Sequence, residues 1–139
     1  AVAQRVTLAR RSIVTPTITL PYYSLFHDPK ATPTSYELTA KGWKELKEAA
    51  LPFIKARVGM LMVEGYTDHH GSSRSNQIES YQRALTVRQF LIDELGFDAQ
   101  RVVAIGFGEG EPDDESMAPG HVQANRRIVL KAVVGAGEH

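Results

Sequence analysis

The sequence contains no cysteine, which excludes disulfides, thiolate metal sites and catalytic thiols. It also has no apolar run approaching the ~18–20 residues that a helix needs to span a bilayer. Its 16 basic residues balance its 16 acidic residues, so it lacks the basic excess that nucleic-acid binding usually requires. Because the chain begins with Ala1 instead of Met, we expect any signal or membrane anchor to lie in a preceding segment absent from this sequence.

The composition is that of an ordinary globular protein, with 42% hydrophobic and 23% charged residues. The length of 139 residues suffices for one domain with a sizeable core. We predict that residues 18–134 form this domain, preceded by an extension or linker at 1–17 and followed by a tail at 135–139.

Apolar periodicity predicts four strands and two main helices. The strands are expected within 13–20 and at 58–66, 101–107 and 127–134. Pro16 interrupts the first segment, so it is either an edge strand or a strand that begins after this proline. The second is a nearly continuous apolar run, typical of a strand buried on both faces. A long ordered loop is predicted at 21–38, and loops of this length are often functional.

The first helix is expected to begin near residue 40, with Thr39 as its N-cap. Pro52 should kink this helix or end its regular part. Apolar residues spaced by three to four predict the packed face. That face comprises Trp43, Leu46, Ala50 and Ile54.

The second helix is expected to run from an N-cap at Asn76 to a C-cap at Gly96. Asn76 and Glu79 have the spacing of a capping box. Its apolar face is predicted to comprise Ile78, Tyr81, Leu85, Ile92 and Leu95. Ser80 and Arg83 would then lie on a polar stripe turned away from that face.

The order of elements is strand, helix, strand, helix, strand, loop, strand. Helical crossovers predict that the first three strands are parallel neighbours, and the last strand could return antiparallel. The predicted fold class is therefore α/β: a two-layer sandwich with a mixed sheet of about four strands and two main helices.

Two opposite charges stand out where a ligand site would be expected. Asp68 follows the apolar run at 58–66, and Arg83 lies in the early turns of the next helix. The carboxyl ends of strands are where open α/β sheets bind ligands. Arginine can clamp a carboxylate, and aspartate accepts hydrogen bonds from an ammonium. The pair thus suits an amino-acid-like ligand, although the spacing alone favours a plain structural salt bridge, worth about 0–1 kcal/mol if exposed.

Four motifs together resemble the OmpA C-terminal-like domain family. They are Gly65-Tyr66-Thr67-Asp68-x-x-Gly71-Ser72, then Asn76 with Ser80 and Arg83-Ala84, then Gly106-x-Gly108-Glu109-x-x-Pro112, and Asn125-Arg126-Arg127-Ile128. Segments 26–32 and 38–42 are similar to the family upstream, so the resemblance covers about residues 18–134.

The resemblance implies non-covalent binding of the peptidoglycan stem peptide, mainly through meso-diaminopimelate. Asp68 would receive the ammonium and Arg83 the carboxylate of that residue. His27 would offer backbone groups, with Thr67, Asn76 and Arg127 in support. The family also implies a protein without catalysis or cofactor that anchors an envelope protein or complex to the cell wall. Its location would be the periplasm of a Gram-negative bacterium, with association to the outer membrane.

Two positions and one segment depart from the family pattern. Glu79 stands where the family usually has leucine, and His27 replaces a residue that is commonly Asp or Asn. Extra residues at 33–37 could reshape the rim of the site.

Other functions remain open at this point. The domain could be an assembly module of an envelope secretion or motor complex, binding peptidoglycan weakly or not at all. Asp68-His69-His70 resembles the start of a metal-dependent phosphoesterase site, but His27 and His121 are isolated and the acidic residues at 113–115 lie in a loop. The glycines at 106–110 lack the helix that a dinucleotide fingerprint needs. Serines near His69 have no nucleophile elbow.

Overall fold

The computed structural model describes residues 17–28, 35–56, 59–68, 71–109 and 125–133. The predicted extension (apart from Thr17) and the tail at 135–139 lie outside these residues. So do residues 33 and 34 of the extra segment, His69, His70, His121 and the acidic residues at 113–115.

A mixed sheet of four strands forms one layer of the molecule, as predicted. The strands are β1 (Thr17–Pro21), β2 (Met60–Tyr66), β3 (Val102–Gly106) and β4 (Arg127–Val133). Their spatial order is β1-β4-β2-β3, with β2 and β3 parallel and β4 antiparallel to both β1 and β2. The return of the last strand is confirmed, and β1 is an edge strand.

Of the first three strands, β2 and β3 are parallel neighbours as predicted, but the prediction that β1 lies beside β2 is wrong, because β4 separates them. The physical reason lies in the burial of β4. Consecutive residues Ile128, Val129 and Leu130 are all buried, so side chains on both sides of this strand are shielded from solvent, as expected for a strand in the middle of the sheet. In contrast, β2 alternates between buried and half-buried residues, so its predicted burial on both faces is wrong.

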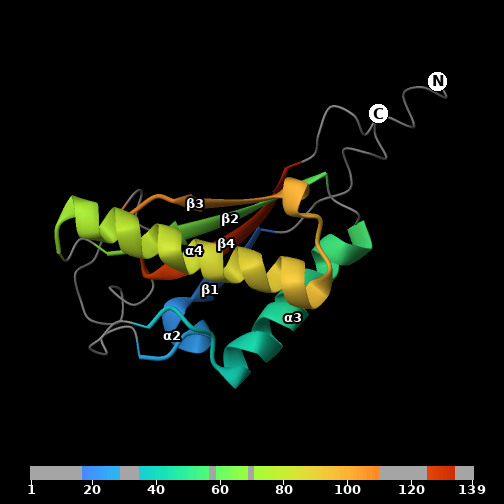
Figure 1. Ribbon diagram of the computed structural model, residues 1–139, viewed down its shortest axis with the longest axis horizontal. Coiled ribbons are helices and arrows are strands. Elements are labelled where there is room, and N and C mark those ends of the chain that lie inside the picture. Colours follow the sequence, from blue (N-terminus) through green and yellow to red (C-terminus); the bar gives the residue numbers. More distant parts are fainter. Residues whose placement is uncertain (1–16, 29–34, 57–58, 69–70, 110–124, 134–139) are drawn as a thin grey trace.

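Two long helices cover one face of the sheet, which confirms the two-layer sandwich (Figure 1). They are α3 (Ala40–Ala56) and α4 (Ser73–Leu95). The predicted loop at 21–38 also contains a helical turn, α2 (Tyr22–Leu25), and a β-bridge between Phe26 and Leu38. Leu25, Phe53, Val63 and Ile128 are among the residues of the core between the layers.

Helix α3 begins as predicted, because the Gly42 N–H donates to the Thr39 hydroxyl over 2.9 Å. The prediction of its packed face is partly wrong. Leu46 and Ala50 are buried, but Trp43 and Ile54 are 41% and 45% exposed, and Phe53 fills the core instead. Pro52 does not end the helix, since it removes only one backbone donor and the packing of its neighbours keeps the last turn in place.

Helix α4 begins earlier than predicted. Ser72 caps it by accepting a hydrogen bond from the Ser75 N–H, so Asn76 lies within the helix and forms no capping box with Glu79. The C-cap at Gly96 is confirmed, with φ 76°.

The buried face of α4 is rotated from the predicted one. Ile78 and Tyr81 are 48% and 42% exposed. The residues that face the sheet are Asn76, Ser80, Arg83, Ala84, Val87, Phe90 and Leu91. The cause is close packing against two glycines of the sheet. A Cβ at Gly65 would lie 2.1 Å from the Ser80 carbonyl oxygen, so the strand residue at this crossing has no room for a side chain.

Gly65→Ala should lower the free energy of unfolding by about 3 kcal/mol, because backbone atoms of α4 would have to move. Gly96→Ala is the matched control: nothing lies within 4 Å of its Cβ, and only its left-handed backbone is strained, at about 1–2 kcal/mol. Denaturant unfolding of both variants measures the difference. An equal or smaller loss for Gly65→Ala would contradict the close-packing argument.

Candidate functional site

The candidate site lies where β2 and β3 end beside the first turns of α4. The Thr67 N–H donates to the Gly108 carbonyl over 2.7 Å, which joins the turns that follow the two strands. The Gly108 N–H in turn donates to the Ser80 hydroxyl of α4 over 2.9 Å. These bonds fix the strand ends against the helix, so side chains from both converge at this edge of the sheet.

Arg83 is the most deeply buried charge among the residues that the structure describes. Its side chain has no exposed surface, and its guanidinium lies 4.7–5.2 Å from the ring centres of Tyr22, Phe26 and Tyr36. The Nε atom donates to Glu79 Oε2 over 3.0 Å, and Nη2 lies 2.9 Å from the same oxygen. Nη1 is buried without a hydrogen-bond partner in the described part of the chain.

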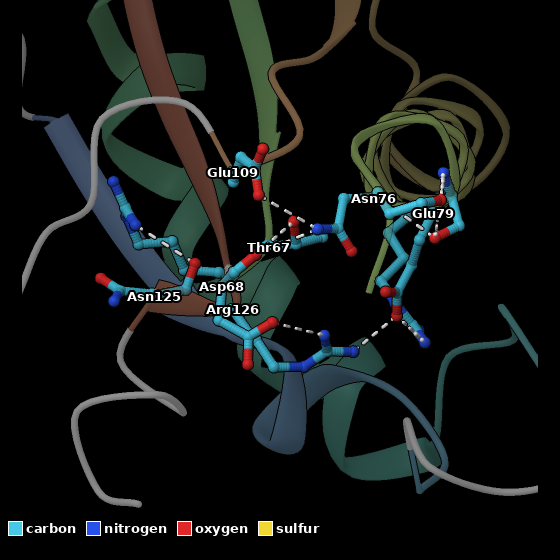
Figure 2. A network of polar contacts seen from close by, with 11 residues as sticks. Thr67, Asp68, Asn76, Glu79, Glu109, Asn125 and Arg126 are labelled. Carbon is cyan, nitrogen blue, oxygen red and sulfur yellow. Dashed lines mark hydrogen bonds and ion pairs between the residues drawn. The ribbon is translucent and has the colours of Figure 1, made fainter. Parts of the chain in front are cut away.

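Arg126 connects this buried group to Asp68 (Figure 2). Its Nη2 donates to Glu79 Oε2 over 2.5 Å, and its Nη1 lies 3.6 Å from Asp68 Oδ1. Asp68, Arg126, Glu79 and Arg83 thus form one ion network, in that order. The direct Asp68–Arg83 bridge that the spacing allowed is replaced by this arrangement. Both predicted residues are at the same site, at its two ends.

Thr67 and Asn76 support the turn that carries Asp68. Both are buried. The Thr67 hydroxyl donates to the Asp68 carbonyl over 3.2 Å, and the Asn76 amide donates to the same carbonyl over 3.3 Å. Asn76 also reaches Glu109 Oε2 over 3.4 Å (Figure 2). Their contacts go to the backbone of Asp68, so they position its carboxylate indirectly.

Arg127 and His27 make contacts of a different kind. Arg127 stacks on the Tyr66 ring, 4.2 Å from its centre, and donates to the Asn125 carbonyl over 3.2 Å. These contacts lie across the β2–β4 pair, on the face that the helices do not cover. The His27 side chain is exposed, and the backbone N–H of His27 donates to the Glu37 carbonyl over 3.4 Å.

Sequence reasoning missed Arg126, although its motif was recognised. The signal was available in the alternation of β4. Ile128 and Leu130 point into the core under the helices, so the residue two positions before Ile128 shares their side of the strand. That residue is Arg126, and its neighbour Arg127 points the other way. Glu79 was noticed only as a departure and was given a capping role that it does not have.

The Tyr22 hydroxyl is a second buried polar group beside Arg83. It has no hydrogen-bond partner among the described residues. Burial raises the pKa of this phenol well above its ordinary value, although the positive charge of Arg83 acts in the opposite direction. Tyr22 therefore remains neutral in the folded protein and serves as an aromatic wall for the guanidinium.

Among the described residues, no group of three His, Cys, Asp or Glu side chains could hold a metal ion. Within the same residues, no helix combines the length and apolar character needed to cross a membrane.

The OmpA family model matches residues 32–126 of this chain. Two curated proteins are similar in sequence. Outer membrane porin F of Pseudomonas aeruginosa is 43% identical over 67 residues, covering 48% of this chain and 19% of that protein. Outer membrane protein A of Klebsiella aerogenes is 34% identical over 102 residues, covering 72% of this chain and 27% of that protein. The chain thus spans about a quarter or less of these relatives.

Solved structures share the fold at low sequence identity. The periplasmic domain of Helicobacter pylori MotB has a TM-score of 0.72 at 19% identity, covering 88% of this chain and 78% of that one. The cell wall anchor of the T6SS from Pseudomonas aeruginosa has 0.71 at 21%, covering 94% of each. The peptidoglycan-associated lipoprotein of Burkholderia pseudomallei has 0.62 at 24%, covering 76% and 86%.

Glu79→Gln should lower the free energy of unfolding by about 2–4 kcal/mol, because it leaves the buried Arg83 guanidinium without its anionic partner. Adding Arg83→Met should recover part of this loss, since an apolar side chain among three aromatic rings needs no counter-ion. Denaturant unfolding of the two single variants and the double variant gives the coupling. Strictly additive losses would show that the pair does not stabilise the fold.

Tyr22→Phe should reduce the amount by which the free energy of unfolding falls at alkaline pH. The phenol pKa is raised by folding, so the unfolded state releases this proton first, near pH 10. The contribution of the neutral Tyr22 phenol to the free energy of unfolding is therefore fully present below pH 10 and is lost as the pH rises further. Unfolding midpoints of both proteins between pH 8 and pH 11 measure this. Parallel curves would contradict the assignment of a neutral, buried Tyr22.

Proposed function

The chain belongs to the OmpA family, and from this premise we propose that its domain binds peptidoglycan non-covalently through a group that carries both an ammonium and a carboxylate. The single observation that carries the proposal is the Arg83 guanidinium. It is completely buried, its Nη1 atom has no hydrogen-bond partner among the described residues, and it shares one site with the carboxylate of Asp68. Buried donors are rarely left without an acceptor, so this edge suits an incoming carboxylate.

Diaminopimelate of the stem peptide has the required chemistry. One end carries a carboxylate for Arg83 and an ammonium for Asp68. Thr67 and Asn76 hold the turn that presents Asp68. His27 would contribute backbone groups of its loop, and Arg127 would steady the Tyr66 ring beneath the site. These residues bind and position a ligand, so we expect neither catalysis nor a cofactor.

The biological role that follows is anchoring of an envelope protein or complex to the cell wall. Similar folds occur in a cell wall anchor and in a peptidoglycan-associated lipoprotein, both from Gram-negative bacteria. We therefore place the domain in the periplasm, associated with the outer membrane, with peptidoglycan as its partner and other envelope proteins as further partners. Attachment to a membrane would require a segment outside this chain.

A second candidate function is an assembly module that does not bind peptidoglycan. One observation favours it: the charges of Asp68 and Arg83 already have internal partners in Arg126 and Glu79. A domain of this kind would keep the ion network for stability alone.

Purified domain should sediment with insoluble peptidoglycan, and Asp68→Asn or Arg83→Lys should each reduce the bound fraction at least about tenfold. Asp68→Asn removes the charge that receives the ammonium, and Arg83→Lys keeps a charge but loses the planar fork. The measurement is the amount of protein in the pellet over a range of peptidoglycan concentrations.

Arg88→Lys is the matched control, because Arg88 lies on the same helix but bonds the Val102 and Ala99 carbonyls at the opposite end of β3. It should sediment like the unchanged domain. Unfolding midpoints exclude loss of structure as the cause. If neither site variant differs from the control, the site assignment is wrong, and if no protein sediments at all, the assembly module is the better account.

A further inference from the structure

The ion network is electrically neutral and mostly buried. It contains two carboxylates and two guanidinium groups, and their side chains are 0–18% exposed. A charge left without a partner in such surroundings is costly, because the low local dielectric strengthens every electrostatic term and water cannot compensate. Any ligand that enters must therefore leave the total charge of the site close to zero.

The two central members present the same charges as the proposed ligand. Glu79 directs a carboxylate at the Nε and Nη2 side of Arg83. Arg126 directs a cation at Asp68. The Arg126–Glu79 contact of 2.5 Å is much shorter than the 3.6 Å between Arg126 and Asp68, so Arg126 lies closer to Glu79 than to Asp68. Figure 2 shows Arg126 lying between the two carboxylates.

We propose that Glu79 and Arg126 determine the specificity of this site, because their neutral pair admits a ligand that brings both a carboxylate and an ammonium and opposes a ligand that brings only one of them. The inference rests on the proposed function of the Asp68–Arg83 site and adds a rule for what that site accepts. A lone carboxylate would leave the site with a net negative charge, and a lone ammonium with a net positive one. A zwitterion leaves it neutral.

Removing one member of the pair should then change the preferred ligand in a predictable direction. Glu79→Gln gives the site one net positive charge and should favour a ligand with carboxylates alone. Arg126→Gln gives it one net negative charge and should favour a ligand with ammonium groups alone. A purely structural role would weaken all ligands together, so opposite changes in preference distinguish the two roles.

Three small probes of related carbon skeleton test this rule: meso-diaminopimelate, pimelate, which lacks both amino groups, and 1,5-diaminopentane, which lacks both carboxylates. Dissociation constants come from NMR titrations that follow the Thr67 and Gly108 amides. The unchanged domain should prefer diaminopimelate. Glu79→Gln should raise the affinity for pimelate relative to diaminopimelate about tenfold, and Arg126→Gln should do the same for 1,5-diaminopentane.

Two control variants correct for the change in overall charge. Glu94→Gln and Arg101→Gln alter the same formal charges at exposed positions away from the site, and neither should change the order of the probes. Spectra and unfolding midpoints verify that each variant is folded. The inference would be overturned if the dissociation constants of all three probes changed by the same factor in both site variants. It would also be overturned if the control variants showed the same change in preference.

Sedimentation with peptidoglycan separates this inference from the proposed function. If the unchanged domain sediments but the probe preferences do not move in opposite directions, the specificity rule is wrong and the function stands. If the preferences move as expected but nothing sediments, the rule stands and peptidoglycan is the wrong ligand. If no probe binds any variant and nothing sediments, both fall.

Discussion

A guanidinium buried among aromatic rings requires a negative charge beside it, and the rest of this site follows from that requirement. Arg83 has no exposed surface, so its charge would be very costly without Glu79. Glu79 in turn draws in Arg126, and Arg126 reaches Asp68. One buried charge thus links the turn after β2, the helix α4 and the start of β4, which are far apart in the sequence.

The fold makes this burial feasible by bringing α4 unusually close to the sheet. Gly65 and Gly106 leave no room for side chains beneath the helix, and Ser80 lies directly above them. The helix therefore turns a partly polar face inward, and Arg83 enters the protein instead of projecting into solvent. Helix α2 then supplies Tyr22, which completes the enclosure with Phe26 and Tyr36.

The sequence predicted the fold class well because strands and helices leave periodic patterns, and the motif around Asp68 and Arg83 predicted two side chains that one ion network joins at an edge of the sheet. It failed where tertiary packing overrode periodicity. Ile78 and Tyr81 looked like core residues, but glycines in distant strands rotated the helix. The position of β4 was also missed, because strand order depends on pairing between segments. Arg126 could have been chosen over Arg127 from alternation alone, whereas the partnership of Glu79 required coordinates.

Asp68 and Arg83 already pair with Arg126 and Glu79 inside the protein, and this is compatible with ligand binding. Charges that are buried before a ligand arrives need partners of opposite charge. Charges that are already fixed and partly dehydrated need little reorganisation when a matching ligand enters, which is the advantage of preorganisation. The exchange is favourable only if the ligand replaces the interactions that it disturbs. In the proposed site, a neutral network would therefore do more than stabilise the fold: it would make discrimination by charge a consequence of burial, with Glu79 and Arg126 as the groups that a ligand must match.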